Sequence, residues 1–279
     1  MKINLAKSAG FCFGVKRAID IAYKTLAGNK NVCMLGNIVH NEDVARSLRE
    51  AGINRCKKLG CGKNKIFLIR AHGASLDIAN KAGRLGYKIV NATCPMVKEI
   101  HKIACSAERK GYTIIVIGDK KHDEVIGIIG QLKRKALIID SMEGAPLGKI
   151  EKIKKAAIVA QSTQNIEKVM RIFYFLDSHI KELKLFNTIC RPTRLKQQEM
   201  KKMPLDNDIM IIIGSKTSAN TQRLYEISKS LNDKSYLVQS KKDIKPEWFK
   251  GIKTAGITAG ASTPDDTTKE VISCIRKIA

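Results

Sequence analysis

Five short runs of apolar, largely β-branched residues divide the chain and restrict the folds that it can adopt. They are residues 65–69, 113–117, 156–160, 208–213 and 254–257. Each run is apolar almost without a break, which is typical of parallel strands buried on both faces. Longer amphipathic segments separate the runs, namely 15–25, 44–50, 96–110, 166–176 and 223–231. The alternation predicts an α/β fold with mostly parallel sheets and helical crossovers.

The composition places the chain among globular proteins. It has 279 residues, of which 44% are hydrophobic and 28% charged, so a disordered or collagen-like chain is excluded. No stretch approaches the ~18 uninterrupted apolar residues of a membrane span, and the N-terminal residues lack the apolar region of a signal peptide. We therefore expect a cytoplasmic protein with no membrane partner.

Small, hydroxylated or imidazole side chains follow all five apolar runs, in the segments 70–75, 118–124, 161–165, 214–220 and 259–265. Ligands bind at the carboxyl ends of parallel strands, and a Ser, Thr or Asn that precedes a helix leaves backbone N–H groups that attract anions. Any one segment is most simply an ordinary helix cap. Five together, with His40, His72 and His122 in or near such turns, favour a common phosphate or diphosphate ligand.

The chain contains eight cysteines. Without a secretion signal, and with enough apolar residues for a full core, they are better explained by a metal site, catalysis or burial than by disulfides. No CxxC pair occurs, which excludes zinc-ribbon and thioredoxin-like motifs. We expect Cys33, Cys105 and Cys274 in the core, and Cys56 and Cys61 in a loop with no special role.

The other three cysteines, Cys12, Cys94 and Cys190, each lie where a predicted strand leads into a helix. Backbone N–H groups and the helix dipole favour a thiolate at such junctions. The separations are similar, 82 residues from Cys12 to Cys94 and 96 from Cys94 to Cys190, which suggests three αβ lobes that each donate one thiolate. Three thiolates suit an iron–sulfur cluster with one iron open to substrate, and the spacing alone leaves a zinc site as the alternative.

The charge is strongly positive, with 51 basic and 26 acidic residues and a net charge of +25. The basic residues are spread along the chain, so two interpretations stay open: attraction of an acidic partner, or a lysine-rich surface without a dedicated partner. There is no nucleic-acid-binding motif and only 5% of the residues are aromatic, so we expect no nucleic-acid partner.

Nine short motifs occur in order along nearly the whole chain. They are 10–12 (Gly-Phe-Cys), 38–41 (Ile-Val-His-Asn), 71–73 (Ala-His-Gly), 92–95 (Ala-Thr-Cys-Pro), 122–125 (His-Asp-Glu-Val), 161–163 (Gln-Ser-Thr), 188–190 (Thr-Ile-Cys), 214–220 (Gly-Ser-Lys-Thr-Ser-Ala-Asn) and 258–262 (Thr-Ala-Gly-Ala-Ser). Any one is a weak signal, but nine in one order are specific. The chain resembles the 4-hydroxy-3-methylbut-2-enyl diphosphate reductases, the last enzymes of the methylerythritol phosphate route to isoprenoids.

The resemblance implies three αβ lobes in pseudo-threefold arrangement around one [4Fe–4S] cluster per chain, with Cys12, Cys94 and Cys190 as its three cysteine ligands. The remaining iron is expected to bind the hydroxyl oxygen of the allylic diphosphate substrate. Two electrons and protons then remove this oxygen as water and give isopentenyl and dimethylallyl diphosphate. Such reductases receive electrons from small acidic proteins, ferredoxin or flavodoxin, which a basic enzyme attracts at low salt.

The resemblance also assigns the other site residues. Glu124 matches the acid that delivers protons, whereas from the residues alone a glutamate at a helix start is expected to be exposed. The substrate-binding positions are His40, His72, His122, Ser162, Ser218, Asn220 and Ser262.

We expect the lobes to comprise residues 12–94, residues 95–190 and residues 191–279. The first carries Cys12 and the diphosphate-site histidines, and the second carries His122 and Glu124 and ends at Cys190. The third carries Ser218, Asn220 and Ser262 and is completed by an N-terminal strand within residues 1–11.

Five positions depart from the residues usual in that family: Asp123 stands for proline, Ser162 for threonine, Pro192 for alanine, Lys196 for arginine and Ala219 for serine. The hydroxyl is kept at position 162, whereas position 219 loses one potential hydrogen bond to the diphosphate. None of the five changes a thiol or Glu124, so we expect an active enzyme whose substrate affinity is the property affected. A non-catalytic metal-binding protein and a phosphate-binding module without a cluster are the competing classes.

Overall fold

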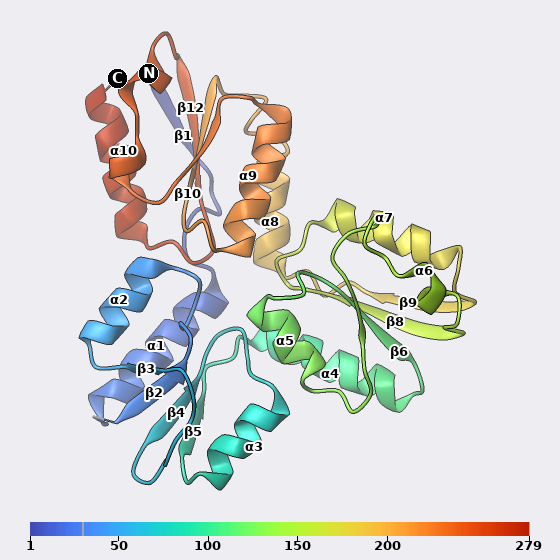
Figure 1. The fold of residues 1–279 in the computed structure, drawn as a ribbon. Coiled ribbons are helices and arrows are strands. Elements are labelled where there is room, and N and C mark those ends of the chain that lie inside the picture. The colour runs from blue at the N-terminus through green and yellow to red at the C-terminus, as the bar shows by residue number, and fades with distance from the viewer. Residues whose placement is uncertain (30, 279) are drawn as a thin grey trace. The chain divides into compact units, whose positions relative to one another are not determined.

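The computed structural model describes residues 1–29 and 31–278, and within them the strands form three four-stranded parallel sheets (Figure 1). Sheet A has the order β1 (Lys2–Leu5), β12 (Thr254–Ala259), β10 (Ile209–Ile213) and β11 (Ser235–Val238). Sheet B has the order β3 (Asn54–Cys56), β2 (Val32–Leu35), β4 (Ile66–Ile69) and β5 (Lys88–Asn91). Sheet C has the order β7 (Leu137–Ile139), β6 (Thr113–Ile117), β8 (Lys155–Ala160) and β9 (Glu182–Phe186). The predicted α/β class with parallel sheets is confirmed.

The three sheets share one strand order. In sheets B and C, the strand that comes second along the chain lies at one edge and pairs with the first. The third strand pairs with the other side of the first, and the fourth lies at the opposite edge. Sheet A repeats this order with β10, β11 and β12, but its fourth position is filled by β1 from the start of the chain. Lys2 pairs with Thr254, and Leu5 pairs with Ile257. The sequence shows no repeat at the level of residues, yet the fold uses one αβ arrangement three times.

Helices connect most successive strands, as is usual for parallel pairing, whereas residues 57–65 join β3 to β4 without a helix. They are α1 (Phe13–Ala27), α2 (Glu42–Glu50), α3 (Leu76–Arg84), α4 (Pro95–Arg109), α5 (Asp123–Ile129), α6 (Leu147–Ile150), α7 (Ile166–Asp177), α8 (Arg191–Met200), α9 (Ala219–Leu231) and α10 (Asp265–Ile278). Two short 3₁₀ helices, η1 (Lys241–Asp243) and η2 (Pro246–Phe249), lie between β11 and β12. Among the residues that the structure describes, no helix has the length and apolar character needed to cross a membrane.

The chain forms two compact units. The first comprises residues 1–16, 39–46 and those from 191 onward, and it contains sheet A. The second comprises residues 17–38 and 47–190, and it contains sheets B and C. The expected boundaries of the three lobes stay a proposal, because they divide the chain differently from these units.

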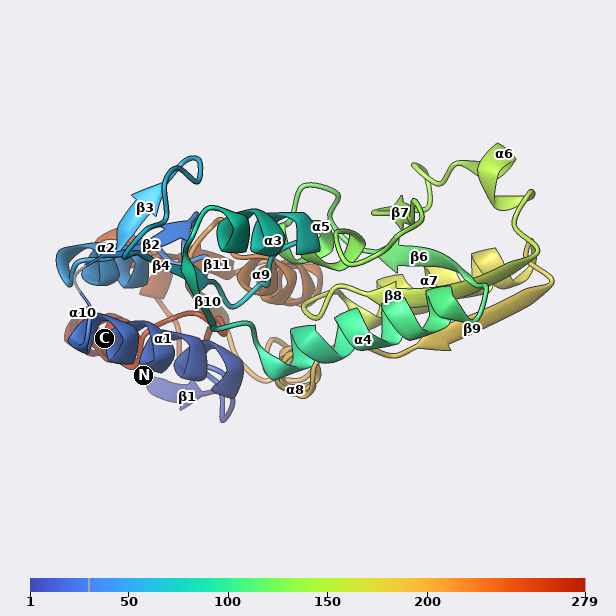
Figure 2. The same cartoon turned by 90° about the horizontal axis from the view of Figure 1, so that it is seen from below.

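The apolar strands are covered on both faces. In sheet C, Ile115 and Ile117 pack with Ile172 of α7, whereas their neighbours in β6 pack with α4 and α5 on the other face. Figure 2 shows α4 running along this sheet. In sheet A, Ile211 packs toward α10 and Ile212 packs toward α9, and Figure 1 shows these two helices on opposite faces. Alternate residues of one strand therefore serve two separate cores, which explains the unbroken apolar runs of the sequence.

Candidate active site

The polar segments predicted from the sequence follow the carboxyl ends of the central strands. His72 follows β4, His122 and Glu124 follow β6, and Ser162 follows β8. In the first unit, Ser218 and Asn220 follow β10, and Ser262 follows β12. Because β6 and β8 are parallel neighbours, their carboxyl ends meet at one edge of sheet C, and the same holds for β10 and β12 in sheet A.

Glu124 is a buried, doubly hydrogen-bonded side chain of the second unit. It lies in the first turn of α5 and is only 2% exposed. Its Oε1 accepts a hydrogen bond from the Ser162 backbone N–H at 2.5 Å, and its Oε2 accepts one from the Ser162 hydroxyl at 2.7 Å. Burial raises the pKa of the Glu124 carboxyl, and the two hydrogen bonds from Ser162 oppose that rise. The exposed glutamate expected from the residues alone is therefore wrong.

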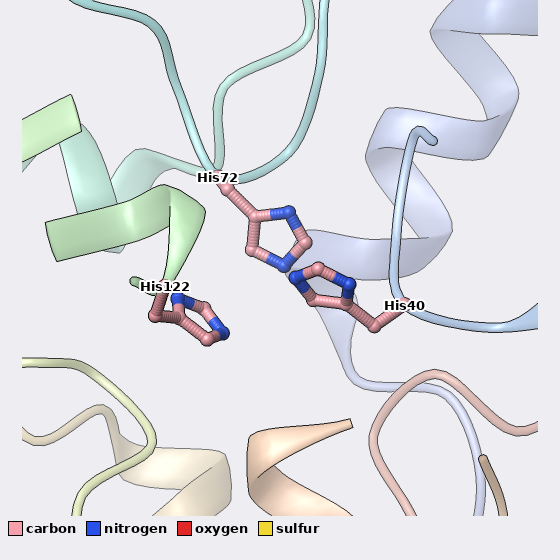
Figure 3. A group of neighbouring side chains, drawn as sticks. All are labelled: His40, His72 and His122. Carbon is pink, nitrogen blue, oxygen red and sulfur yellow. The ribbon is translucent and has the colours of Figure 1, made fainter. Parts of the chain in front are cut away.

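His122 caps the helix that carries Glu124. Its Nδ1 accepts a hydrogen bond from the Glu124 backbone N–H at 3.1 Å, which places the proton of a neutral ring on Nε2. The His72 ring lies against it with centroids 5.4 Å apart and planes at 90° (Figure 3). A turn closed by a hydrogen bond from Gly73 N to Arg70 O at 3.0 Å positions His72, and Gly73 has the left-handed φ of 82° that favours glycine. The two imidazoles thus come together at the ends of β4 and β6, and Glu124 follows His122 by two residues in the first turn of α5. His72, His122 and Glu124 are called the histidine–carboxyl group below.

Two of the three proposed ligand cysteines are tied to this group. Cys94 is the N-cap residue of α4, and its backbone N–H donates to Ala71 O at 2.9 Å, next to His72. Cys190 immediately precedes α8, and its backbone N–H donates to Ser162 O at 3.0 Å. Both side chains are half-buried. Each predicted strand-to-helix junction is present. The backbone of each cysteine bonds a neighbour of the histidine–carboxyl group, since Ala71 precedes His72 and Ser162 binds the Glu124 carboxyl.

Cys12 lies in the first unit, directly before α1. Its backbone N–H donates to Ala261 O at 3.1 Å and its carbonyl accepts from Lys16 N at 3.0 Å, which starts the helix. The preceding loop passes Gly10, whose φ of 87° is left-handed. The side chain of Cys12 is half-buried, as are those of Cys94 and Cys190.

A buried lysine fastens the loop that carries Cys12. Lys196 of α8 is 2% exposed and donates to Gly10 O at 3.1 Å, to Ala259 O at 2.9 Å and to Ser8 O. One turn later, Glu199 accepts from the Ser8 backbone N–H at 3.2 Å. Since an ammonium group has three N–H donors, three carbonyl acceptors satisfy it fully. Two side chains of α8 thereby hold this loop against the end of β12.

The remaining substrate-binding candidates lie at the carboxyl edge of sheet A. The Ser262 hydroxyl donates to His40 O at 3.1 Å, and Ser218 is the N-cap of α9. Asn220 is 4% exposed, and within the described part of the chain neither its amide nitrogen nor its amide oxygen has a hydrogen-bond partner. A buried amide without a partner costs free energy, so this side chain is suited to hydrogen-bond a ligand at the start of α9.

Sequence reasoning missed several residues that position the site. Thr188 holds the segment before Cys190, because its hydroxyl bonds both Ala160 N and Ala160 O at 2.7 Å. The sequence identifies Lys196 only as a departure from arginine, and no feature of the sequence predicts that this lysine is buried. His101 of α4 lies close to Gly73, and burial lowers the pKa of its imidazole to about 4.

The other five cysteines differ in burial. Cys33 is buried, and burial together with the nearby Cys56 raises the pKa of its thiol to about 11. Cys56 is half-buried and Cys61 is exposed. The expected loop is wrong for Cys56, which ends strand β3, pairs with Leu35 and packs against the core of sheet B. Cys105 and Cys274 are half-buried, so the expectation that they lie in the core is wrong. Cys274 lies at the margin of the sheet A core, and the Cys105 thiol lies beside Gln131 O.

Comparison with known proteins gives a full-length match. The LytB protein family matches residues 3–276. A 4-hydroxy-3-methylbut-2-enyl diphosphate reductase of Aquifex aeolicus (strain VF5) is 39% identical over 99% of this chain and 96% of its own. The reductase of Geobacter metallireducens (strain ATCC 53774 / DSM 7210 / GS-15) is 38% identical over 100% of this chain and 98% of its own.

Two solved structures are also similar. One, described as the terminal enzyme of the non-mevalonate pathway, is 39% identical, with a TM-score of 0.74 over 99% of this chain and 100% of that chain. The other, the E-1-hydroxy-2-methyl-but-2-enyl-4-diphosphate reductase of Plasmodium falciparum, is 26% identical, with a TM-score of 0.88 over 98% of this chain and 87% of that chain. The similarity to known reductases thus extends over sequence and fold alike.

Proposed function

Because the chain belongs to the LytB protein family, we propose that the residues at its strand ends form the active site of a diphosphate reductase. The enzyme is an oxidoreductase of isoprenoid biosynthesis that reduces (E)-4-hydroxy-3-methylbut-2-enyl diphosphate to isopentenyl and dimethylallyl diphosphate. The net change replaces a C–O bond by a C–H bond, consumes two electrons and two protons, and releases water. The observation that carries the site assignment is the buried Glu124 carboxyl, which Ser162 holds in the first turn of the helix capped by His122.

Enzymes of this family are iron–sulfur proteins. For this chain we assign one [4Fe–4S] cluster, held by Cys12, Cys94 and Cys190. The donor chemistry fits the group, because each half-buried thiol immediately precedes a helix, where the backbone N–H groups favour a thiolate. When bound, such a cluster supplies electrons and, at an iron without a cysteine ligand, a Lewis acid for the substrate hydroxyl.

Glu124 is assigned as the proton donor. Its raised pKa favours the protonated form, which a general acid requires, and its two contacts with Ser162 fix the direction of the carboxyl. Ser162 was assigned to substrate binding from the sequence. Its hydroxyl contact with Glu124 supports an additional role in orienting the acid.

The diphosphate-binding assignment covers the three histidines and the hydroxyl and amide side chains of sheet A: His40, His72, His122, Ser218, Asn220 and Ser262. It is supported by the unpartnered Asn220 amide and by the neutral tautomer of His122, which offers an Nε2–H donor. Hydrogen-bond donors and a helix N-terminus are what a diphosphate needs.

An acidic ferredoxin or flavodoxin is the proposed electron donor. The net charge of +25 supports electrostatic attraction, and such attraction weakens as salt is added. We assign the enzyme to the cytoplasm. If electron delivery from an acidic donor is unchanged by salt, the lysines are a general surface feature and this partner is wrong.

Anaerobic purification tests the cluster and its ligands together. We expect a brown protein with about four irons per chain, and loss of iron and reductase activity when any of the three cysteines is changed to serine. Cys61→Ser is the matched control, since this thiol is exposed and is expected to leave both properties unchanged. A colourless protein with stoichiometric zinc, or equal loss in the Cys61 variant, contradicts the assignment.

Glu124→Gln tests the acid. The amide keeps the shape of the side chain but cannot donate a carboxylic proton, so turnover is expected to fall roughly 10²-fold with substrate binding retained. Unchanged turnover removes Glu124 from its role.

A further inference from the structure

An ion pair joins the two segments that carry the histidine–carboxyl group. Arg70 lies two residues before His72, and Asp123 lies between His122 and Glu124. The Arg70 Nη1 is 2.6 Å from the Asp123 Oδ2, and the side chains are only 21% and 24% exposed. A pair with this shielding is screened less by salt than a fully exposed one. It connects the end of β4 in sheet B with the end of β6 in sheet C.

Packing restricts the Arg70 side chain independently of the ion pair. It lies against Gly36, where an added Cβ would overlap the guanidinium. Gly36 has a φ of 76°, so both its conformation and the approach of Arg70 favour glycine. Because packing already limits the side chain, less entropy is lost when the ion pair forms.

The other end of α5 is fastened to the same loop. Leu76 N donates to Gly130 O at 3.0 Å, and Gln131 Nε2 donates to Ala74 O at 2.8 Å. Between the two ends, a Cβ added at Gly127 would lie 3.1 Å from His72 O. The remaining cavity along this contact measures about 30 Å³, room for about one water molecule. Helix α5 and the loop at 70–76 therefore pack closely along their whole contact.

The Arg70–Asp123 pair is the ionic contact at the end of this interface that faces the site. The His72 and His122 rings are in contact beside it, with centroids 5.4 Å apart. Glu124 follows Asp123 directly in the first turn of α5. A shift of α5 along the loop would therefore move His122 and Glu124 together relative to His72.

Asp123 is the first residue of α5. An aspartate there adds a negative charge at the helix N-terminus and provides the partner for Arg70. It leaves φ unrestricted, whereas a proline at this position would fix φ without losing a needed N–H. In this chain an electrostatic contact therefore restrains the start of α5.

We propose that Arg70 and Asp123 are positioning residues that hold His72 in register with His122 and Glu124 for substrate binding and proton delivery. The proposal rests on the proposed function of this site. Neither residue is assigned a contact with substrate, so the effect of each is transmitted through the loop and the helix that carry the three site residues.

A double-mutant cycle on the holoenzyme tests the pair. Asp123→Asn removes the charge at nearly constant shape, and Arg70→Met removes the partner. We expect each to raise KM for the substrate about five- to tenfold and to weaken the binding of inorganic pyrophosphate by calorimetry to the same extent. The double variant should be no worse than either single variant. Iron content and melting temperature should stay near those of the parent enzyme.

Asp123→Pro is the rescuing variant, because proline fixes φ at the helix start and so supplies a covalent restriction where the ion pair is lost. It should bind pyrophosphate more tightly than Asp123→Asn. The matched control is Asp140→Asn, which breaks the more exposed pair formed with Lys120 at 3.7 Å and should change neither binding nor KM.

The outcomes distinguish the positioning role of the ion pair from the proposed function of the site. If the parent enzyme is active and binds pyrophosphate, two results overturn the positioning role alone. One is an Asp123→Asn variant that equals the parent enzyme, and the other is additive losses in the double variant. A parent enzyme that neither binds pyrophosphate nor reduces the substrate overturns the proposed function itself. An Asp123→Pro variant that binds no better than Asp123→Asn also counts against positioning.

Discussion

Ser162→Ala is expected to raise the pKa of the Glu124 carboxyl. The substitution removes the 2.7 Å hydrogen bond from the Ser162 hydroxyl to Oε2 and leaves the 2.5 Å bond from the backbone N–H to Oε1. A hydrogen bond to a charged group contributes about 1.5–3 kcal/mol, and a neutral carboxyl keeps roughly half of it. The differential loss is therefore about 0.75–1.5 kcal/mol, and it raises the pKa of Glu124.

The sign of the effect follows from which form the hydroxyl stabilises. Burial already raises this pKa, and the Ser162 hydroxyl lowers it, so removing the hydroxyl raises it further. If Glu124 acts as a general acid, turnover declines as pH rises through its pKa. The alkaline limb of kcat should then move to higher pH in Ser162→Ala.

The assay is the pH profile of kcat with a chemical reductant, together with the infrared band of the protonated carboxyl in parent and variant. Ser162→Thr is the control, because it keeps a hydroxyl at this position and should leave the limb in place. An alkaline limb that does not move in Ser162→Ala, or that moves equally in Ser162→Thr, refutes the coupling between Glu124 and this hydroxyl.

Three further substitutions test how the site is supported. Lys196→Met leaves three buried carbonyls without their donor and should lower the free energy of unfolding by about 3 kcal/mol. Lys196→Arg should retain most of this stability, and urea denaturation of both variants measures the difference. The His101 pKa of about 4 lies below the unfolded value, so the stability it contributes is complete above pH ~6.5 and is lost as pH falls toward 4, by roughly 3 kcal/mol. In His101→Leu, urea unfolding should lose this part of the pH dependence, and an unchanged dependence contradicts the assignment. Gly10→Ala forces a side chain into a left-handed conformation 2.8 Å from Asp265 Oδ1 and should cost about 1–3 kcal/mol in thermal unfolding. Gly28→Ala, with open space around it, is its control and should be near neutral.

The sequence predicted the central strands better than the edge strands. The five apolar runs correspond to β4, β6, β8, β10 and β12, each of which has a strand on both sides. The edge strands β3, β7, β9 and β11 were not predicted, and neither was β2, which lies between β3 and β4. β9 (Glu182–Phe186) shows why, because its residues alternate between exposed and half-buried and include two charged side chains. A strand paired on one side is less buried, so it carries no continuous apolar signal.

The sequence could predict site residues that directly follow a strand, but not residues whose contacts are with partners distant in the sequence. The junctions that carry Cys12, Cys94 and Cys190 could be located from the alternation of strands and helices, although their role as ligands stays a prediction. Glu124 could be found only through the resemblance, since a carboxyl at a helix start looks exposed until Ser162 is known to cover it. Lys196 is one of 51 basic residues, and only the fold distinguishes a lysine buried on three carbonyls from those on the surface.

The pairing of β1 with β12 also bears on the order of events during synthesis. β1 precedes the other described strands in the sequence, whereas its neighbour β12 is the last of them to be made. Sheets B and C have all their strands earlier, so they can form before β12 is made. The loop that ends at Cys12 depends on β12 and α8, and it therefore takes shape only after both have been made. The placement of the Cys12 thiol consequently waits for β12, and a truncation that removes β12 would leave this distant loop without its support.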